Sequence, residues 1–147
     1  ALDAFEGVVI ASHANARALL SNSGERQLTD RTIRRLVERD GVMGLVPYNR
    51  FLRREWKNGD PREQIPLEML AAHIDHVCQL AGNARHVALG SDFDGGFGYP
   101  AVPLELNTIA DLPKIAPLLR EKGYGEDDIQ AILHDNWLRI LERTLPA

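Results

Sequence analysis

The chain contains three short runs of apolar residues, and each has the pattern of a strand buried on both faces. They cover residues 8–12, 42–46 and 86–90. Each run is too short for a helix, and each is too uniformly apolar for a half-exposed strand, which alternates apolar and polar side chains. We therefore predict three strands inside a layered α/β fold.

Segments with helical periodicity separate these predicted strands. Thr29 is a suitable N-cap for a helix over 30–39, and further helices are predicted over 66–80 and near 112–122. Acidic residues at 126–128 favour the first turn of a last helical segment, which continues to the end of the chain. Strands that alternate with helices predict right-handed crossovers and a parallel sheet.

The length of the chain limits the size of this fold. Its 147 residues are enough for a single α/β unit over 1–147, but not for two full-sized domains. A complete (β/α)8 barrel takes about 250 residues. The chain could therefore supply only the last part of such a barrel, or it could form an independent small sheet with helices on both faces. Composition leaves both alternatives open.

Composition excludes several classes of protein. Hydrophobic residues make up 44% and charged residues 26%, which is ordinary for a soluble domain, and the net charge of −4 argues against nucleic acid or an anionic membrane as partner. Arg50, Arg53, Arg54 and Lys57 form a local basic cluster, which we interpret as a solvated face. Cys78 is the only cysteine, so an intrachain disulfide is excluded.

Membrane and secretion signals are also lacking in the sequence. No apolar segment approaches the ~20 residues that span a bilayer. The first residues do not have the layout of a signal peptide. We therefore expect a cytoplasmic protein without a membrane segment.

Chemistry-bearing side chains follow two of the predicted strands. His13 comes directly after the first run, and Asp92 and Asp94 come directly after the third. Because parallel strands end at the same edge of a sheet, these side chains should lie close together, where α/β folds bind ligands. Two carboxylates at this edge of the sheet require a positively charged partner, because desolvating an unpaired carboxylate is costly. A histidine beside a carboxylate suits a metal site or an acid–base pair.

Several motifs along the chain resemble elements of one enzyme family. Residues 12–19 resemble the family element SHSNARAL, and residues 90–95 match GSDFDG. Residues 26–30, 73–76, 123–129 and 136–140 are similar to RNLTD, HLDH, GYSEEDI and NFLRV, in the same order. Together these elements resemble the membrane (renal) dipeptidase family, the M19 metallopeptidases, in its C-terminal part.

This resemblance implies a (β/α)8 barrel with a dinuclear zinc site that hydrolyses dipeptides. His13 would be a ligand of the second zinc, and Arg26 would hold the C-terminal carboxylate of the substrate. Asp92 would face the zinc-bound water and handle the proton during attack on the peptide carbonyl. Asp94 either reaches the site or caps the loop through Gly95 and Gly96.

The remaining metal ligands of the family lie upstream of the region that is matched. They are a His-x-Asp pair, a bridging Glu and another His. The resemblance therefore implies that this chain carries only part of the active site and is inactive in isolation. The outer strands of a partial barrel have edges without neighbours. We expect them to be covered in a homo-oligomer or by the missing N-terminal part.

Other interpretations of the same motifs remain open. A strand that ends in Asp-x-Asp-Gly also resembles the nucleophile motif of haloacid-dehalogenase-type phosphatases. That interpretation needs a second acidic strand end, whereas Asp127 and Asp128 begin a predicted helix. A non-catalytic remnant of the dipeptidase fold, with a binding or structural role, is another alternative. His73 and His76 share one predicted helix, and structural hydrogen bonds are favoured there over a metal.

Overall fold

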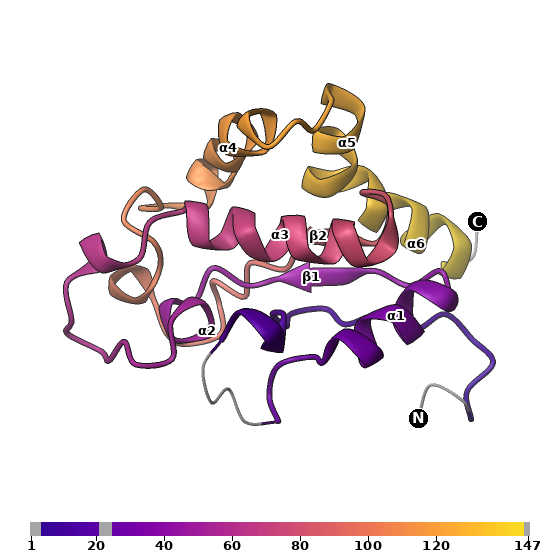
Figure 1. Ribbon diagram of the computed structural model, residues 1–147, viewed down its shortest axis with the longest axis horizontal. Helices are drawn as coiled ribbons and strands as arrows, with labels where there is room; N and C mark the ends of the chain where they lie inside the picture. The colour runs from indigo at the N-terminus through magenta and orange to yellow at the C-terminus, as the bar shows by residue number, and fades with distance from the viewer. Residues whose placement is uncertain (1–3, 21–24, 146–147) are drawn as a thin grey trace.

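The computed structural model describes residues 4–20 and 25–145, and its sheet contains two short parallel strands (Figure 1). They are β1 (Met43–Leu45) and β2 (Val87–Leu89), and their register pairs the first residue of each strand. Helices surround both strands. The predicted parallel α/β fold class is therefore confirmed.

The first predicted strand does not form as a strand: the run at 8–12 lies beside β1, where it was expected, but it makes only one isolated bridge. Ala11 forms a single parallel bridge with Met43, and its N–H donates to the Val42 carbonyl across 2.9 Å. The segment thus runs along the edge of β1 that β2 leaves free. Ile10 is 43% exposed, and no described residue pairs along the outer edge of this segment. Hydrogen bonding on one side alone leaves the rest of the run without regular strand geometry.

The helices include the predicted segments, with differences at their ends, and also short helices that the sequence did not predict. They are η1 (Arg17–Leu19), α1 (Asp30–Glu38), α2 (Asn49–Leu52), η2 (Arg62–Gln64), α3 (Glu68–Ala81), η3 (Tyr99–Ala101), η4 (Ile109–Lys114), α4 (Ile115–Glu121), α5 (Glu126–Gln130), the π-helical η5 (Ala131–Asp135) and α6 (Asn136–Thr144). Thr29 caps α1 as predicted, because its side chain accepts from the Thr32 N–H. The last helical segment ends at Thr144, and residues 146–147 lie outside the described residues.

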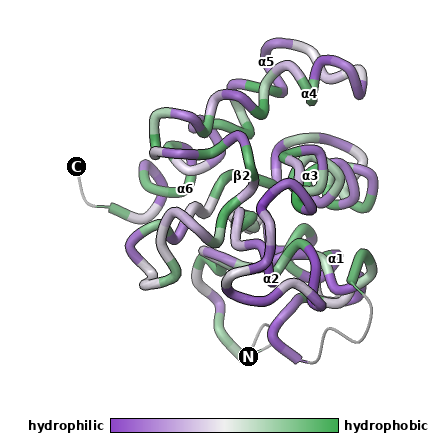
Figure 2. The backbone as a smooth tube through the Cα atoms, turned by 90° about the vertical axis from the view of Figure 1, so that its left-hand side faces the viewer, coloured by the Kyte–Doolittle hydropathy of each residue, from purple (hydrophilic) through white to green (hydrophobic). Residues whose placement is uncertain are grey.

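Helices cover both faces of the two strands. Met43, Leu45 and Val87 belong to the main core, to which α3 contributes, whereas Val42 and Ala88 pack against α6 on the opposite face. Figure 2 shows α3 and α6 on either side of β2. This alternation follows from the period of two residues in a strand. It explains why the runs are apolar throughout.

The last helices attach to the strands through polar side chains. The amide of Asn136 donates to the carbonyls of Ala84 and Val87, across 2.7 and 2.8 Å. The indole N–H of Trp137 donates to the carbonyl of Leu89 across 2.8 Å. These bonds satisfy carbonyl groups beside and within β2 that the two-stranded sheet leaves free.

A charged cluster closes the amino ends of the strands. The carboxylate of Asp40 lies 3.3 Å from Arg85, 3.1 Å from Arg139 and 2.5 Å from Arg143. Burial raises the pKa of Asp40, but the hydrogen bond from Arg85 and the three positive charges outweigh that effect and lower it. The Nδ1–H of His86 donates to a main-chain carbonyl 2.9 Å away. Each of these groups therefore has a partner.

The helical histidines have structural partners, as predicted. Nδ1 of buried His73 accepts from the N–H of Ala16 at 3.2 Å, and Nε2 of His76 donates to Asp30 at 2.8 Å. Burial, with a smaller effect from His76, lowers the pKa of His73 to about 4. His73 is therefore neutral near pH 7 and holds the segment around Ala16 against α3.

None of the helices in the described part of the chain is long and apolar enough to cross a bilayer. Cys78 is buried in α3, and burial raises the pKa of its thiol to about 11. A thiol with such a pKa stays protonated and is a poor nucleophile.

Candidate active site at the carboxyl ends of the strands

Glycines let the segment before His13 lie close to the carboxyl ends of β1 and β2. A Cβ atom placed on Gly90 would lie 2.1 Å from the Ser12 carbonyl oxygen, and one placed on Gly44 would lie 2.2 Å from the same atom. Any larger residue at these positions would push the first segment away. His13 therefore follows this segment next to the point where the chain turns from Gly90 toward Asp92.

His13 is exposed, and one of its ring nitrogens is free to bind a ligand. Its Nδ1 lies 2.7 Å from the hydroxyl of Ser12, and its carbonyl accepts from the guanidinium of Arg26 at 2.9 Å. Its Nε2 has no hydrogen-bond partner within residues 4–20 and 25–145. The ring is thus oriented on one side and available on the other, as a metal-ligating histidine requires.

Asp92 closes a tight turn, and its carboxylate lies beside Gly95 of that turn. Its φ of +51° lies in the left-handed region, and its carbonyl accepts from the N–H of Gly95 at 2.8 Å. A Cβ on Gly95 would lie 2.5 Å from Oδ1 of Asp92, so only glycine leaves room for the carboxylate in this position. The half-buried carboxylate makes no hydrogen bond or ion pair with any described residue.

Asp94 is exposed, and in the described ranges its carboxylate also lacks a partner. The bond that closes this loop comes from the main chain of Asp92, not from the side chain of Asp94. The structure therefore gives no support to the interpretation of Asp94 as the loop cap. Asp94 remains a candidate for contact with the site.

Arg26 lies on an aromatic platform that the sequence analysis missed. Its guanidinium carbon is 4.8 Å from the ring centre of Phe51. Tyr48 meets Phe51 edge to face at 4.9 Å and stacks on Phe97 at 4.6 Å. The available signal was the position of Tyr48 and Phe51, three residues apart and directly after the second apolar run.

This platform borders two hollows. One, of about 200 Å³, is lined by Arg26, and the other, of about 320 Å³, is lined by Asp92. Tyr48 and Phe51 line both. The structure thus brings the predicted arginine and the predicted carboxylate to the two sides of one aromatic pair, although no contact joins their side chains.

The chemistry of the donors suits a divalent metal ion, but their number does not complete a site. An imidazole nitrogen from His13 is a ligand that zinc accepts, and so is a carboxylate oxygen such as those of Asp94. Among the residues that the structure describes, no group of three or more His, Cys, Asp or Glu side chains could hold a metal. A complete site would need ligands from outside them.

Comparison with known proteins identifies the family. The model of the family described as membrane dipeptidase (peptidase family M19) matches residues 2–145. The chain belongs to the membrane dipeptidase family. The predicted family is therefore confirmed.

Relatives and solved structures of this family agree with the assignment. The chain is 38% identical over 134 residues to an uncharacterized protein in the pqqA 5′ region of Klebsiella pneumoniae, covering 91% of this chain and 46% of that protein. It is 33% identical to the dipeptidase aclJ of Aspergillus oryzae, covering 90% of this chain and 29% of that protein. The chain thus spans less than half the length of these curated relatives.

A solved metallopeptidase shares the fold. The enzyme from Rhodobacter sphaeroides, liganded with a phosphinate mimic of the dipeptide L-Ala-D-Ala, superposes with a TM-score of 0.81 and 31% identity. The match covers 98% of this chain and 38% of that one. This partial match is consistent with the predicted place of the chain, the C-terminal portion of a barrel-like metallopeptidase of the membrane dipeptidase family.

Proposed function

We propose that this protein provides the carboxyl-terminal part of the active site of a zinc-dependent dipeptidase. The observation that carries the proposal is the uneven distribution of charge at the open edge of the strands. One hollow holds the carboxylate of Asp92 without a cation, and the other holds Arg26 without an ion-pair partner in the described residues. In a member of the membrane dipeptidase family, a dipeptide and a metal would supply the missing charges.

Arg26 binds the C-terminal carboxylate of the dipeptide in this proposal. A guanidinium group matches a carboxylate with two parallel hydrogen bonds. Two contacts hold Arg26 in place, since its Nη2 donates to the His13 carbonyl and its guanidinium stacks on Phe51. Its remaining N–H groups are directed by these contacts and are available to the substrate.

Asp92 moves a proton in the hydrolytic step. It accepts a proton from water as the water oxygen bonds to the peptide carbonyl carbon. It then returns that proton to the amide nitrogen as the C–N bond breaks, so that the products are two amino acids. The turn closed on Gly95 fixes the main chain of Asp92, and its carboxylate has no partner among the described residues that would compete for the proton.

His13 would hold the metal through its Nε2 atom. When bound, zinc supplies Lewis-acid polarisation of the peptide carbonyl and lowers the pKa of water. His13 is one ligand, and the others would come from chain outside the described residues or from an associated polypeptide. The isolated chain is therefore expected to be inactive, and its open strand edges would be covered by that polypeptide.

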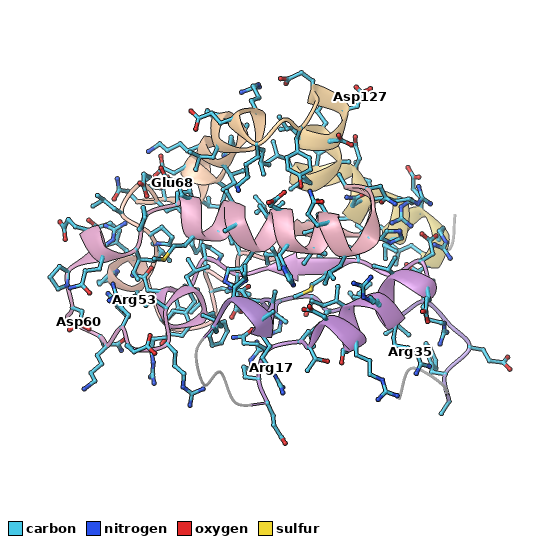
Figure 3. All side chains as sticks on the ribbon, in the orientation of Figure 1. Arg17, Arg35, Arg53, Asp60, Glu68 and Asp127 are labelled. Carbon is cyan, nitrogen blue, oxygen red and sulfur yellow. The ribbon has the colours of Figure 1, made fainter. Side chains whose placement is uncertain are left out.

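Exchange of Asp92 for asparagine in the zinc-loaded, full-length gene product tests this function. We expect Asp92→Asn to lower kcat for dipeptides by about 100-fold or more, because a positioned acid–base group contributes that much. Zinc content, measured by metal analysis, should stay unchanged. Asp127→Asn is the matched control, since Asp127 lies in the first turn of α5, far from α2 (Figure 1 and Figure 3). Unchanged turnover in Asp92→Asn would remove Asp92 from the mechanism.

A non-catalytic protein that keeps the fold for binding is the alternative function. Absence of zinc and of dipeptide hydrolysis in the full-length product would establish this alternative. The phosphatase interpretation is wrong, because the chain belongs to the membrane dipeptidase family and its second acidic pair begins helix α5.

A further inference from the structure

The hollow beside Arg26 is more basic than the binding of one carboxylate requires. Arg50 and Arg54 line it together with Arg26, and its other lining residues are neutral (Leu20, Gln27, Tyr48 and Phe51). Three arginines therefore line a space of about 200 Å³, and no acidic residue lines it.

The two additional arginines have no anionic partner in the described part of the chain. Arg50 and Arg54 are exposed, and neither makes a hydrogen bond or an ion pair with a described residue. The segment at 21–24, which precedes Glu25, contains no acid in its sequence. Glu25 itself does not line the hollow. The positive charge is thus left for a ligand.

Only some arginines of the local basic cluster line the hollow. Arg53 is also exposed and lies between them in sequence, yet it does not line the hollow. Arg50 lies in α2 (Asn49–Leu52), whereas Arg54 follows the extended residue Arg53, so the fold of this segment and not helical spacing brings Arg50 and Arg54 to the same hollow. The local basic cluster is therefore divided, with Arg50 and Arg54 at the hollow and Arg53 directed elsewhere.

We infer that this hollow receives a second anionic group, the side-chain carboxylate of a dipeptide whose C-terminal residue is aspartate or glutamate. The inference rests on the proposed function, in which Arg26 holds the main-chain carboxylate. One carboxylate is matched by one guanidinium fork, so Arg50 and Arg54 remain for another. Liquid water takes up about 30 Å³ per molecule, so the hollow has room for a carboxymethyl or carboxyethyl group.

A pair of dipeptides that differ only in this charge tests the inference. In the zinc-loaded, full-length gene product, we expect kcat/KM for Ala-Asp to exceed that for its neutral isostere Ala-Asn by at least tenfold. The double variant Arg50→Gln/Arg54→Gln should reduce this ratio to less than threefold. Arg53→Gln is the matched control and should keep the ratio of the unaltered protein. Added salt should lower the preference, because it screens exposed charges.

The outcomes separate this inference from the proposed function. Hydrolysis of both dipeptides at equal kcat/KM, or a preference that survives the double variant, would overturn the inference and leave the dipeptidase intact. If neither dipeptide is hydrolysed, the affinities of the same two dipeptides, measured by calorimetry, test the inference. Tighter binding of Ala-Asp that depends on Arg50 and Arg54 would support the anion site although the proposed function fails. Equal or absent binding would overturn the inference as well.

Discussion

The charged side chains at the two ends of the parallel strands differ in whether they have partners within the protein. At the amino ends, the carboxylate of Asp40 meets three arginines, and Asn136 satisfies two carbonyl groups. At the carboxyl ends, the carboxylates of Asp92 and Asp94 meet no cation among the described residues.

This difference separates what stabilises the fold from what prepares it for a ligand. Polar groups that are paired within the protein contribute to its free energy of unfolding. Groups left without partners contribute little stability but can bind something that brings the opposite charge. The division agrees with the general arrangement of (β/α) folds, in which the amino ends carry stability and the carboxyl ends carry chemistry. Substitutions at each end can test it.

The largest expected effect on stability is at Asn136. In Asn136→Ala, two carbonyl groups lose their donor in a place where Asn136 is only 4% exposed. We expect the free energy of unfolding to fall by about 3 kcal/mol, because each buried unsatisfied group costs about 1–3 kcal/mol. The measurement is chemical denaturation of the full-length protein. Asn58→Ala is the control, since Asn58 is exposed at the hollow of Asp92 and should change stability by less than about 0.5 kcal/mol. Equal losses of unfolding free energy in the two variants would contradict the assignment of stability to the amino ends of the strands.

A smaller effect is expected at Asp40, and it should depend on pH. We expect Asp40→Asn to cost on the order of 1 kcal/mol at pH 7, because the side chain of Asp40 is 40% exposed and water screens its ion pairs. The pKa of Asp40 is lower in the folded state than in the unfolded state. Its stabilisation is therefore complete above the unfolded pKa of about 3.9 and is lost as the pH falls through the folded value.

Denaturation curves of the two proteins between pH 7 and pH 2 measure this effect. The difference in unfolding free energy between them should shrink toward zero at the acidic end. Glu142→Gln is the matched control, because Glu142 is an exposed acid on α6 that belongs to no ion pair among the described residues. A difference that stays constant down to pH 2 would show that the charge of Asp40 does not contribute.

The smallest effect on stability is expected at the carboxyl ends. Asp92→Asn and Asp94→Asn remove charges that have no partner in the described residues, so each should change the free energy of unfolding by less than about 0.5 kcal/mol. Asparagine also tolerates the left-handed backbone of Asp92. A loss above 1 kcal/mol in thermal or chemical denaturation would assign Asp92 a structural role and break the comparison.

The sequence by itself determined the class of fold and the edge at which to look for chemistry. Apolar runs at 42–46 and 86–90 became paired strands, and Thr29 caps its helix, because these features depend on neighbouring residues. His13 and Asp92 could be assigned to one edge from sequence because parallel strands end on the same side. The order of the motifs was specific enough to indicate the family.

Only the tertiary structure decided which polar groups are paired and which are not. Arg139 lies 99 residues from Asp40 in sequence, and Asn136 lies 49 from Val87. The pattern of a single helix does not specify such contacts, because they depend on how α6 packs across the strands. The same holds for the basic cluster, in which sequence alone does not distinguish Arg53 from Arg50 and Arg54. Their difference comes from the hollow that the aromatic pair and Arg26 form beside them.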